Sequence, residues 1–366
     1  MRLYFVIKNL STSAGGAERV LTQVASSLAE RSHEVYIASF DPRNSTSFYP
    51  ISPKVNLIYL PSSNNTKQLN IISLVRRVFL LRSSIQIYKP DIVIGFMHSS
   101  FVLAALASVF LRIPIIGSEH IVMKHYYSRP FQFALYLFSS FFVDRYTCTS
   151  QPVASDFPWL IRKKMLVIPN PVSISPSKHF ASSSEKIILN VGRLEKQKDQ
   201  ITLVKAFSKV LKVYPEWLLH IVGSGSLDAP LKSLVSFLKI EDNVIFLGNT
   251  KDIESEYRKA SIFVNSARYE SFGLVTAEAM SFSLPCIGFA DCPGTNDLIK
   301  HGYSGYLVPP YKDRVNALSC VLIDVINNPR HASLLGRNAR DAISSNYSLG
   351  EVVIKWENLL SLTAKK

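Results

Sequence analysis

Short apolar runs rich in β-branched residues alternate with stretches of helical periodicity from one end of the chain to the other. In the first half, the runs that predict strands are 3–7, 35–39, 55–60, 92–95, 115–117, 145–148 and 165–168. In the second half they are 187–191, 218–222, 244–247, 262–264, 286–289 and 305–308, and two helical stretches follow at 331–345 and 349–362. Strands that alternate with helices predict parallel sheets with right-handed crossovers, so an α/β protein is expected.

A segment rich in proline and serine separates the two series of strands. It begins Pro-Asn-Pro-Val-Ser-Ile-Ser-Pro at residue 169 and ends near the serines at 182–184. We predict a linker at 169–185 between a first domain, 1–168, and a second domain, 186–346. Two doubly wound, Rossmann-like domains joined in this way are expected to face each other across a cleft. Their ligands would bind at the carboxyl ends of the strands.

The excess of basic residues is concentrated in the first half. The net charge is +14, and Lys+Arg exceed Asp+Glu by 18 to 8 over residues 1–170 but only by 23 to 19 over residues 171–366. Segment 69–88 places Arg76, Arg77 and Arg82 among apolar residues at helical spacing, and a second basic and aromatic segment spans 124–143. Either segment alone is also typical of a helix that packs one face on a sheet. With no nucleic-acid motif present, the pair favours an anionic membrane surface over nucleic acid.

Other features of composition bear on the compartment. No run reaches the roughly 18 to 20 apolar residues that a membrane-spanning helix needs, so we expect peripheral rather than integral association. The four cysteines show no metal-ligand spacing. In a chain of this size they indicate reduced thiols, and therefore the cytoplasm.

Two carboxylates flank a predicted helix start in the second half. Glu270 and Glu278 are separated by seven residues, and Gly273 between them opens an apolar, alanine-rich stretch. Free N–H groups at a helix start favour a bound anion such as a diphosphate, so the spacing indicates a nucleotide-sugar site. The alternative is that Glu270 stabilises the helix dipole and Glu278 is a solvated surface residue.

Further candidates follow the strands at their carboxyl ends. Arg193 and Lys198 lie just after strand 187–191, where two cations can hold a diphosphate. Gly223 lies in a Gly-Ser-Gly loop after strand 218–222, and Gly16 lies in a glycine pair that opens the first helix. His120 follows strand 115–117, at a position that forms sites in such sheets.

These motifs occur in an order that resembles a known family. They are Gly-Gly-Ala-Glu-Arg at 15–19, Gly-Arg-Leu at 192–194, Gly-Ser-Gly at 223–225, Phe-Gly-Leu between the paired glutamates, and Gly-Tyr-Leu-Val-Pro at 305–309. Together they resemble the retaining, GT-B-fold glycosyltransferases of family four, of the bacterial polysaccharide and lipid-linked glycan type. The resemblance implies that a final helix, 347–366, returns to the first domain.

The resemblance also implies roles for individual residues. Arg193 and Lys198 would hold the diphosphate and offset charge on the leaving group, an electrostatic role in catalysis. Glu270 would contact the donor sugar, and Glu278 would bind the ribose hydroxyls. His120 would lie at the reacting face near the sugar.

The remaining donor contacts would come from backbone and glycine positions. The backbone at Phe272, Gly273 and Leu274 would lie beside the sugar, Gly223 would approach the nucleotide, and Gly16 would approach the phosphate or the acceptor. Two positions depart from the family pattern. Ser271 stands where glycine is common, and Asp-Cys-Pro-Gly-Thr-Asn at 291–296 replaces a glycine-rich Pro-Glu segment. These departures leave the identity of the donor sugar open.

The implied reaction is metal-independent transfer of a hexose or N-acetylhexosamine, with retention at the anomeric carbon. A UDP-sugar is favoured over a GDP-sugar as donor, with no other cofactor, and the acceptor would be a lipid-linked saccharide or glycan in surface polysaccharide synthesis. The Asp-x-Asp typical of metal-dependent sugar transferases is absent from the sequence. We expect a cytoplasmic protein held peripherally at the inner face of the cell membrane. The alternatives are a nucleotide-sugar epimerase on the same fold and a non-catalytic protein that binds sugar nucleotides or membranes.

Overall fold

The computed structural model describes residues 1–366 except 12–14, 61–70, 175–184, 251 and 365–366. The chain divides into two compact units. The first unit comprises Met1–Pro171 with Leu349–Lys366, and the second comprises Val172–Ser348. Most of the predicted linker, residues 175–184, lies outside the described residues.

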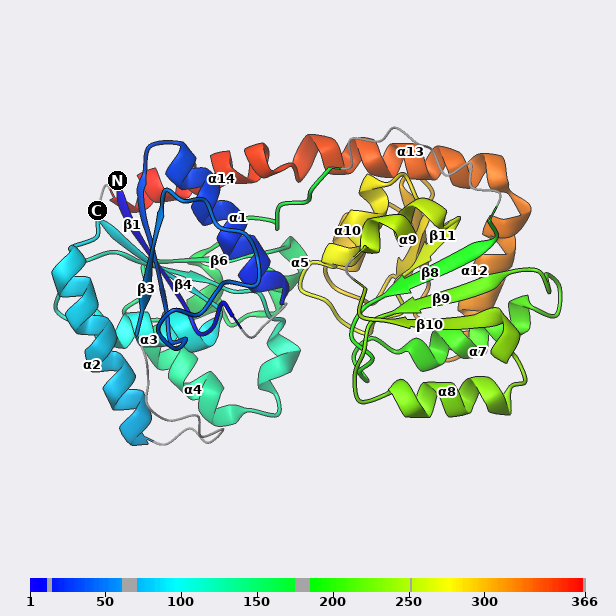
Figure 1. Cartoon of the computed structure of the whole chain (residues 1–366), viewed down its shortest axis with the longest axis horizontal. Coiled ribbons are helices and arrows are strands. Elements are labelled where there is room, and N and C mark those ends of the chain that lie inside the picture. The colour runs from blue at the N-terminus through cyan, green and yellow to red at the C-terminus, as the bar shows by residue number, and fades with distance from the viewer. Residues whose placement is uncertain (12–14, 61–70, 175–184, 251, 365–366) are drawn as a thin grey trace. The chain divides into compact units, whose positions relative to one another are not determined.

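The first unit is built on a parallel sheet that, over its described residues, has seven strands in the order β3-β2-β1-β4-β5-β6-β7 (Figure 1). The central strands β1 and β4 pair in register, with Leu3 opposite Ile92. The order of the strands along the chain reverses between these two. The strand bounds are β1 Arg2–Ile7, β2 Glu34–Ser39, β3 Val55–Tyr59, β4 Ile92–Phe96, β5 Ile115–Ser118, β6 Arg145–Cys148 and β7 Met165–Val167.

Helices cover the sheet of the first unit. The buried positions of the first helix, Val20, Leu21, Val24 and Leu28, recur at the three- and four-residue spacing that makes one apolar face. The last helix of the chain packs on the same core, where the Trp356 ring stacks on Phe96 at 5.9 Å. The helix bounds are α1 Gly16–Glu30, α2 Ile71–Tyr88, α3 His98–Ala107, η1 Met123–Tyr126, α4 Pro130–Ser139, α5 Gln151–Asp156, α6 Trp159–Arg162 and α14 Leu349–Ala364.

The second unit repeats the architecture with six parallel strands among its described residues, in the order β10-β9-β8-β11-β12-β13. Here the order reverses between β8 and β11. The strand bounds are β8 Ile187–Val191, β9 Leu218–Val222, β10 Val244–Gly248, β11 Ile262–Val264, β12 Cys286–Phe289 and β13 Gly305–Val308.

Helices lie on both faces of this second sheet (Figure 1). One apolar core joins the sheet to α7, α8 and α12, and another joins its opposite face to α9, α10 and α13. The bounds are α7 Gln200–Val210, α8 Asp228–Phe237, η2 Glu241–Asn243, α9 Ile253–Lys259, α10 Leu274–Ser281, α11 Thr295–Leu298, α12 Arg314–Asn327 and α13 Pro329–Asn346.

The predicted α/β class with two doubly wound units is confirmed. Every strand predicted from the sequence is present, and no strand end differs from the prediction by more than one residue. Ligands of such sheets bind where the strand order reverses, outside the carboxyl ends of the strands. In this chain these locations are the ends of β8 and β11 in the second unit and of β1 and β4 in the first.

Candidate functional site

Two loops meet at the reversal point of the second sheet, one after β8 and one after β11. The backbone N–H of Arg268 donates to the carbonyl of Gln197 at 2.9 Å, and the Gln197 side chain donates to the carbonyl of Tyr269 at 2.8 Å. The Ser266 hydroxyl donates to the carbonyl of Lys198 at 2.7 Å. These bonds hold the two loops in one fixed arrangement, although they are far apart in the sequence.

Lys198 and Glu270 form an ion pair and a hydrogen bond across these loops. Their side chains are only 15% and 12% exposed, so the pair is largely withdrawn from water. Removing one partner of such a pair would leave the other as an uncompensated charge in a poorly solvated place. The structure thus brings together two residues that the sequence singled out separately.

Arg193 lies in the same loop as Lys198 but is exposed. Within the part of the chain that the structure describes, its guanidinium forms no ion pair. Its carbonyl accepts a hydrogen bond from the Gln200 side chain at 3.1 Å, which fixes the backbone that carries it. An exposed guanidinium on a fixed backbone is well placed to bind an anionic ligand.

Gly223 packs against this loop from the end of β9. Its φ of +131° lies outside the range that other residues readily adopt, and a Cβ there would lie 2.0 Å from the carbonyl oxygen of Gly192. Only glycine therefore allows the loop after β9 to approach the loop after β8 so closely.

Helix α10 begins beside Glu270 and carries Glu278 in its second turn. Gly273 precedes the helix with a left-handed φ of +85°, and Phe272 is buried. At the start of the helix the N–H groups of Leu274 and Val275 precede the first intrahelical bonds, and that of Thr276 donates to the carbonyl of Gly273 at 2.9 Å. The Glu278 carboxylate accepts a hydrogen bond from the Tyr257 hydroxyl of α9 at 3.0 Å. The two glutamates therefore have different partners, Lys198 for Glu270 and Tyr257 for Glu278.

The unusual loop at 291–296 lies directly against the segment that starts at Glu270. A Cβ on Gly294, whose φ is +72°, would lie 2.9 Å from the Glu270 carbonyl oxygen and 2.8 Å from the Phe272 nitrogen. The Asn265 side chain donates to the Thr295 hydroxyl at 3.2 Å. Burial, with a smaller contribution from the Glu270 charge, raises the pKa of Cys292 to about 12. The loop that departs from the family pattern therefore supports the backbone of Glu270.

A group of charged residues that the sequence did not single out stabilises the same loops. Asp199 is buried and pairs with Arg268 at 2.9 Å. Arg314 lies 3.9 Å from Asp199, donates to both carboxylate oxygens of Asp291 at 2.9 and 2.7 Å, and stacks 3.6 Å above the centre of the Phe289 ring. No local pattern marks Arg314, because its partners lie on loops distant in the sequence.

His120, in the first unit, follows β5 as predicted. Its Nε2 lies 3.0 Å from the Ser118 hydroxyl oxygen, and its ring stacks on Phe96 at 5.1 Å. The buried Nδ1 has no hydrogen-bond partner among the residues that the structure describes. Burial lowers the pKa of His120 to about 4, so the imidazole is neutral at pH 7.

Glu119 is a further residue of this loop that the sequence did not assign a role. It is buried and accepts hydrogen bonds from the backbone N–H groups of His120 and Ile121 at 2.9 and 3.0 Å, and from the Tyr126 hydroxyl at 2.6 Å. Burial raises its pKa to about 7. Its carboxyl group fixes the backbone that presents His120. In the sequence, only its position next to His120 at the end of a strand marks Glu119 as a candidate site residue.

Gly16 is the exposed first residue of α1, and Gly15 caps that helix with an extended backbone. Residues 12–14 of the predicted loop lie outside the described residues. Gly16 and His120 thus belong to the first unit, and the other predicted site residues belong to the second.

Two Rossmann-like units with polar residues at the reversal points of their sheets define the GT-B class of fold. Solved structures of this class superpose on nearly the whole chain. A structure of the Anabaena protein HepE in complex with UDP has a TM-score of 0.80 at 19% identity and covers 99% of this chain and 100% of that one. A sucrose-phosphate synthase from Thermosynechococcus elongatus has a TM-score of 0.84 at 21% identity, with both chains covered completely.

Sequence comparison identifies the family. The model "Glycosyltransferase Family 4" matches residues 14–175, and the model "Glycosyl transferases group 1" matches residues 173–342. The chain belongs to the GT-B glycosyltransferases of family four and is therefore a glycosyltransferase.

Two relatives align over almost their full lengths. An uncharacterised glycosyltransferase of Haemophilus influenzae is 29% identical, over 98% of this chain and 99% of its own. A Campylobacter jejuni alpha-1,4-N-acetyl-D-galactosaminyltransferase is 28% identical, over 99% of this chain and 98% of its own. The acceptor in the name of the latter is GalNAc-alpha-(1->4)-GalNAc-alpha-(1->3)-diNAcBac-PP-undecaprenol.

Proposed function

We propose that this glycosyltransferase moves a hexose or N-acetylhexosamine from a UDP-sugar to a lipid-linked or glycan acceptor, with retention at the anomeric carbon. The observation that carries the proposal is the Lys198–Glu270 pair beside the exposed Arg193, at the reversal point of the second sheet. Cations and a carboxylate in this position match the two ends of a nucleotide sugar, its diphosphate and its hydroxyl groups.

Arg193 and Lys198 would bind the diphosphate and offset the negative charge that grows on it as the sugar leaves. Their two positive charges would serve the purpose that a divalent cation serves in metal-dependent enzymes, so we propose that no metal is needed. The N–H groups of Leu274 and Val275, at the start of α10, would add hydrogen bonds to an anion.

Glu270 would accept hydrogen bonds from the sugar hydroxyls, with Lys198 holding its carboxylate in place. Glu278 would accept from the ribose hydroxyls, oriented by Tyr257. His120 would contribute a neutral imidazole at the sugar, since burial lowers its pKa to about 4. We assign no covalent nucleophile, because attack and departure are proposed to share one face of the sugar.

The relatives support the choice of donor and acceptor. The HepE structure holds UDP, which favours a uridine nucleotide over a guanosine one. The Campylobacter relative is named for an acceptor linked through PP to undecaprenol. A lipid-linked saccharide is therefore the acceptor we favour, in the synthesis of a surface polysaccharide or lipopolysaccharide.

The test is a screen of UDP- and GDP-sugars with a lipid-linked acceptor, followed by nucleotide release and proton NMR of the product's anomeric centre. In Arg193→Ala and Glu270→Ala we expect kcat/KM to fall by about 10²- to 10³-fold, because each variant removes one group that stabilises developing charge or holds the sugar. Excess EDTA should leave the wild-type rate unchanged.

The matched control is Lys196→Ala, which removes an exposed cation from the same loop and should leave the rate unchanged. Full activity of Arg193→Ala and Glu270→Ala would contradict the proposed site. Inversion at the anomeric carbon would contradict retention. Conversion of the donor sugar without release of nucleotide would favour an epimerase, and nucleotide binding without turnover of any donor would favour a non-catalytic protein.

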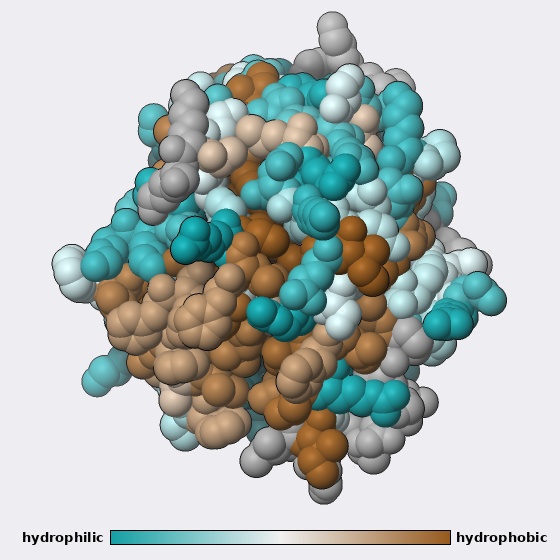
Figure 2. Space-filling view, turned by 90° about the vertical axis from the view of Figure 1, so that its left-hand side faces the viewer, coloured by the Kyte–Doolittle hydropathy of each residue, from teal (hydrophilic) through white to brown (hydrophobic). Residues whose placement is uncertain are grey.

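We also propose that the first unit contacts an anionic membrane surface at the cytoplasmic face. No helix among the described residues is both long and apolar enough to cross a bilayer. Figure 2 views the side on which α2 lies in Figure 1 and shows hydrophobic side chains gathered over a broad area. The exposed large apolar residues of the first unit include Ile72, Val75, Phe79, Ile87, Phe110, Tyr127, Phe131, Phe138 and Phe141.

Basic residues accompany these apolar side chains. Arg76 is exposed on α2 next to Val75, and Arg129 precedes Phe131 at the start of α4. Apolar side chains that enter the headgroup region, together with cations that meet anionic lipid, are the two components of peripheral binding. The cysteines are free thiols, which suits the cytoplasm.

A further inference from the structure

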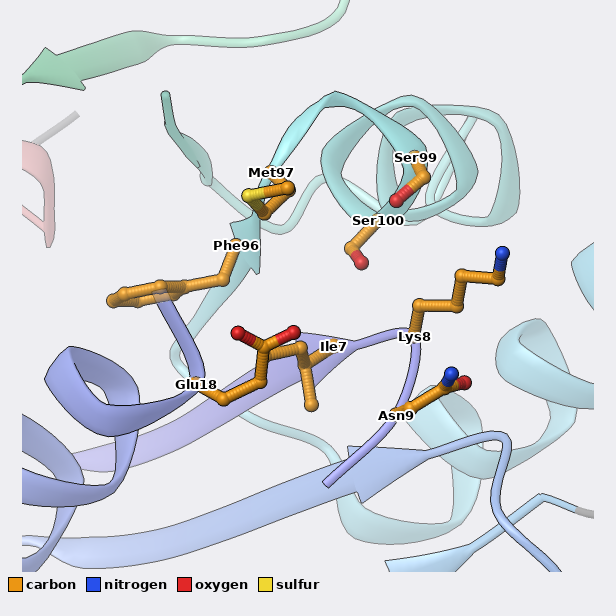
Figure 3. Close-up of a pocket in the computed structure, with 8 residues that line it drawn as sticks. All are labelled: Ile7, Lys8, Asn9, Glu18, Phe96, Met97, Ser99 and Ser100. Atoms are coloured by element: carbon orange, nitrogen blue, oxygen red, sulfur yellow. The ribbon is translucent and has the colours of Figure 1, made fainter. Parts of the chain in front are cut away.

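A cavity of about 110 Å³ lies at the reversal point of the first sheet, and none of the roles proposed above uses it. It is lined by Ile7, Lys8, Asn9, Glu18, Phe96, Met97, Ser99 and Ser100 (Figure 3). Lys8 follows β1, Ser99 and Ser100 lie in the first turn of α3, and Glu18 lies in the first turn of α1. The cavity is therefore formed where ligands bind in doubly wound sheets.

The buried Ser100 hydroxyl is a polar group that a ligand in this cavity could bind. Ser100 is 1% exposed, and its Oγ has no hydrogen-bond partner within the described residues. Figure 3 shows this hydroxyl directed into the cavity, toward the space between Glu18 and Lys8. A buried hydroxyl left without a partner is costly, and a polar ligand would satisfy it.

The start of α3 adds donors to the same place. The helix has ten residues, and the first-turn N–H groups of His98 and Ser99 have no intrahelical acceptor. Its dipole adds a partial positive charge at this end. Met97, before the helix, holds a left-handed φ of +68° that few non-glycine residues adopt.

Basic residues lie in and near the cavity. Burial, and then the nearby His125, Arg129 and Lys8, lower the pKa of His98 to about 4. Arg129 is held in place by the carbonyl of His125, to which it donates at 3.1 Å. The only carboxylate that lines the cavity, within the described residues, is Glu18.

We propose that this cavity binds a phosphate ester of a sugar or polyol, the phosphate being held by Lys8, Ser100 and the start of α3. Glu18 would accept a hydrogen bond from a neighbouring hydroxyl of the same ligand, which explains a carboxylate in an anion site. The inference rests on the proposed transfer to an acceptor that contains phosphate. It assigns to the first unit a phosphate site separate from the donor diphosphate site on the second.

The test measures binding of glucose 1-phosphate to the full chain by ligand-observed NMR or calorimetry. Saturating UDP is present so that the proposed donor site is filled. In Lys8→Met and Ser100→Ala, affinity should fall about tenfold or more, as expected for lost hydrogen bonds to a charged group. The neutral methyl α-glucoside should bind the wild type at least about tenfold more weakly than glucose 1-phosphate.

The matched control is Lys54→Ala, which removes one charge from the same unit outside the cavity and should leave the affinity unchanged. Affinities in Lys8→Met and Ser100→Ala equal to that of the wild type would overturn the proposal, as would equal binding of methyl α-glucoside. UDP affinity is measured in parallel. Failure of the wild type to bind UDP would count against the proposed donor site. The affinities of the wild type and the cavity variants for glucose 1-phosphate would still test the cavity.

Two transfer assays then distinguish the sources of the phosphate. One uses a diphosphate-linked lipid saccharide in vesicles, and the other uses a water-soluble ribitol-phosphate oligomer. If Lys8→Met raises the KM only for the diphosphate-linked lipid saccharide, the ligand of the cavity is a lipid diphosphate. If it raises the KM only for the ribitol-phosphate oligomer, the ligand is a polyol-phosphate polymer. An unchanged KM with both would overturn the assignment to the acceptor.

Discussion

Glu119 shows how one buried carboxyl group positions its neighbour, His120. Three hydrogen bonds converge on its oxygens, from the N–H groups of His120 and Ile121 and from the hydroxyl of Tyr126. Burial nevertheless dominates and raises its pKa from 4.5 to about 7. The folded protein therefore binds a proton here more tightly than the unfolded chain does.

This difference predicts how stability depends on pH. Because the folded pKa is raised, the contribution of Glu119 to stability is fully present below about pH 4.5 and is lost as pH rises through 7. The free energy of unfolding of the wild type, relative to Glu119→Gln, should fall by about 3 kcal/mol between pH 4.5 and 8. Urea unfolding of both proteins across this range measures it. A difference that is independent of pH would show that folding does not raise the pKa of Glu119.

At the scale of elements, glycine decides how closely two segments can pack. Gly336 lies in α13, and a Cβ there would lie 1.9 Å from the carbonyl oxygen of Ser283, just beyond α10. Gly350 lies in α14, and a Cβ there would have no atom within 4 Å. The two helical glycines therefore differ in surroundings rather than in backbone conformation.

Alanine at these two positions should act in opposite directions. Gly336→Ala forces α13 away from the Ser283 segment, and we expect the free energy of unfolding to fall by about 1–3 kcal/mol. In Gly350→Ala it should stay unchanged or rise by less than about 1 kcal/mol, because alanine favours a helix where space is open. Denaturant unfolding of both variants is the measurement. Equal destabilisation would show that the close approach of α13 does not determine the effect.

At the scale of the whole molecule, charge and exposed apolar surface are unequally divided. The first 170 residues have 18 Lys+Arg to 8 Asp+Glu, against 23 to 19 in the remainder. Phe79 and Phe131 of the first unit are 64% and 69% exposed, and Phe237 of the second unit is 82% exposed. Exposure of one aromatic ring is ordinary, whereas many rings together with basic residues indicate a binding surface.

Vesicle sedimentation tests the membrane proposal. The protein should bind anionic vesicles at low salt, and raising NaCl should weaken binding because salt screens the basic side chains. Phe79→Ser and Phe131→Ser should each weaken binding by about tenfold, because each removes an apolar side chain that would enter the membrane. Phe237→Ser is the control and should bind as the wild type does. Binding that is insensitive to salt, or lost equally in the control, would contradict the proposal.

The sequence by itself determined the secondary structure, the class and the family. Strands such as 187–191 and 286–289 are read from local hydrophobic periodicity, and motifs such as Gly-Arg-Leu at 192–194 are local in the same sense. The residue types of the site, Arg193, Lys198 and Glu270, were also identified in this way. Their individual roles stay predictions.

Only the tertiary structure decided which of these residues contact one another and in what environment. The Lys198–Glu270 pair and the contacts of Arg314 join loops that are distant in the sequence, and periodicity carries no information about such contacts. The pKa of Glu119 depends on burial by neighbours from other elements. The cavity beside Ser100 likewise exists only because β1, α1 and α3 come together. Desolvation and contact are properties of the folded chain, which is why the sequence could not supply them.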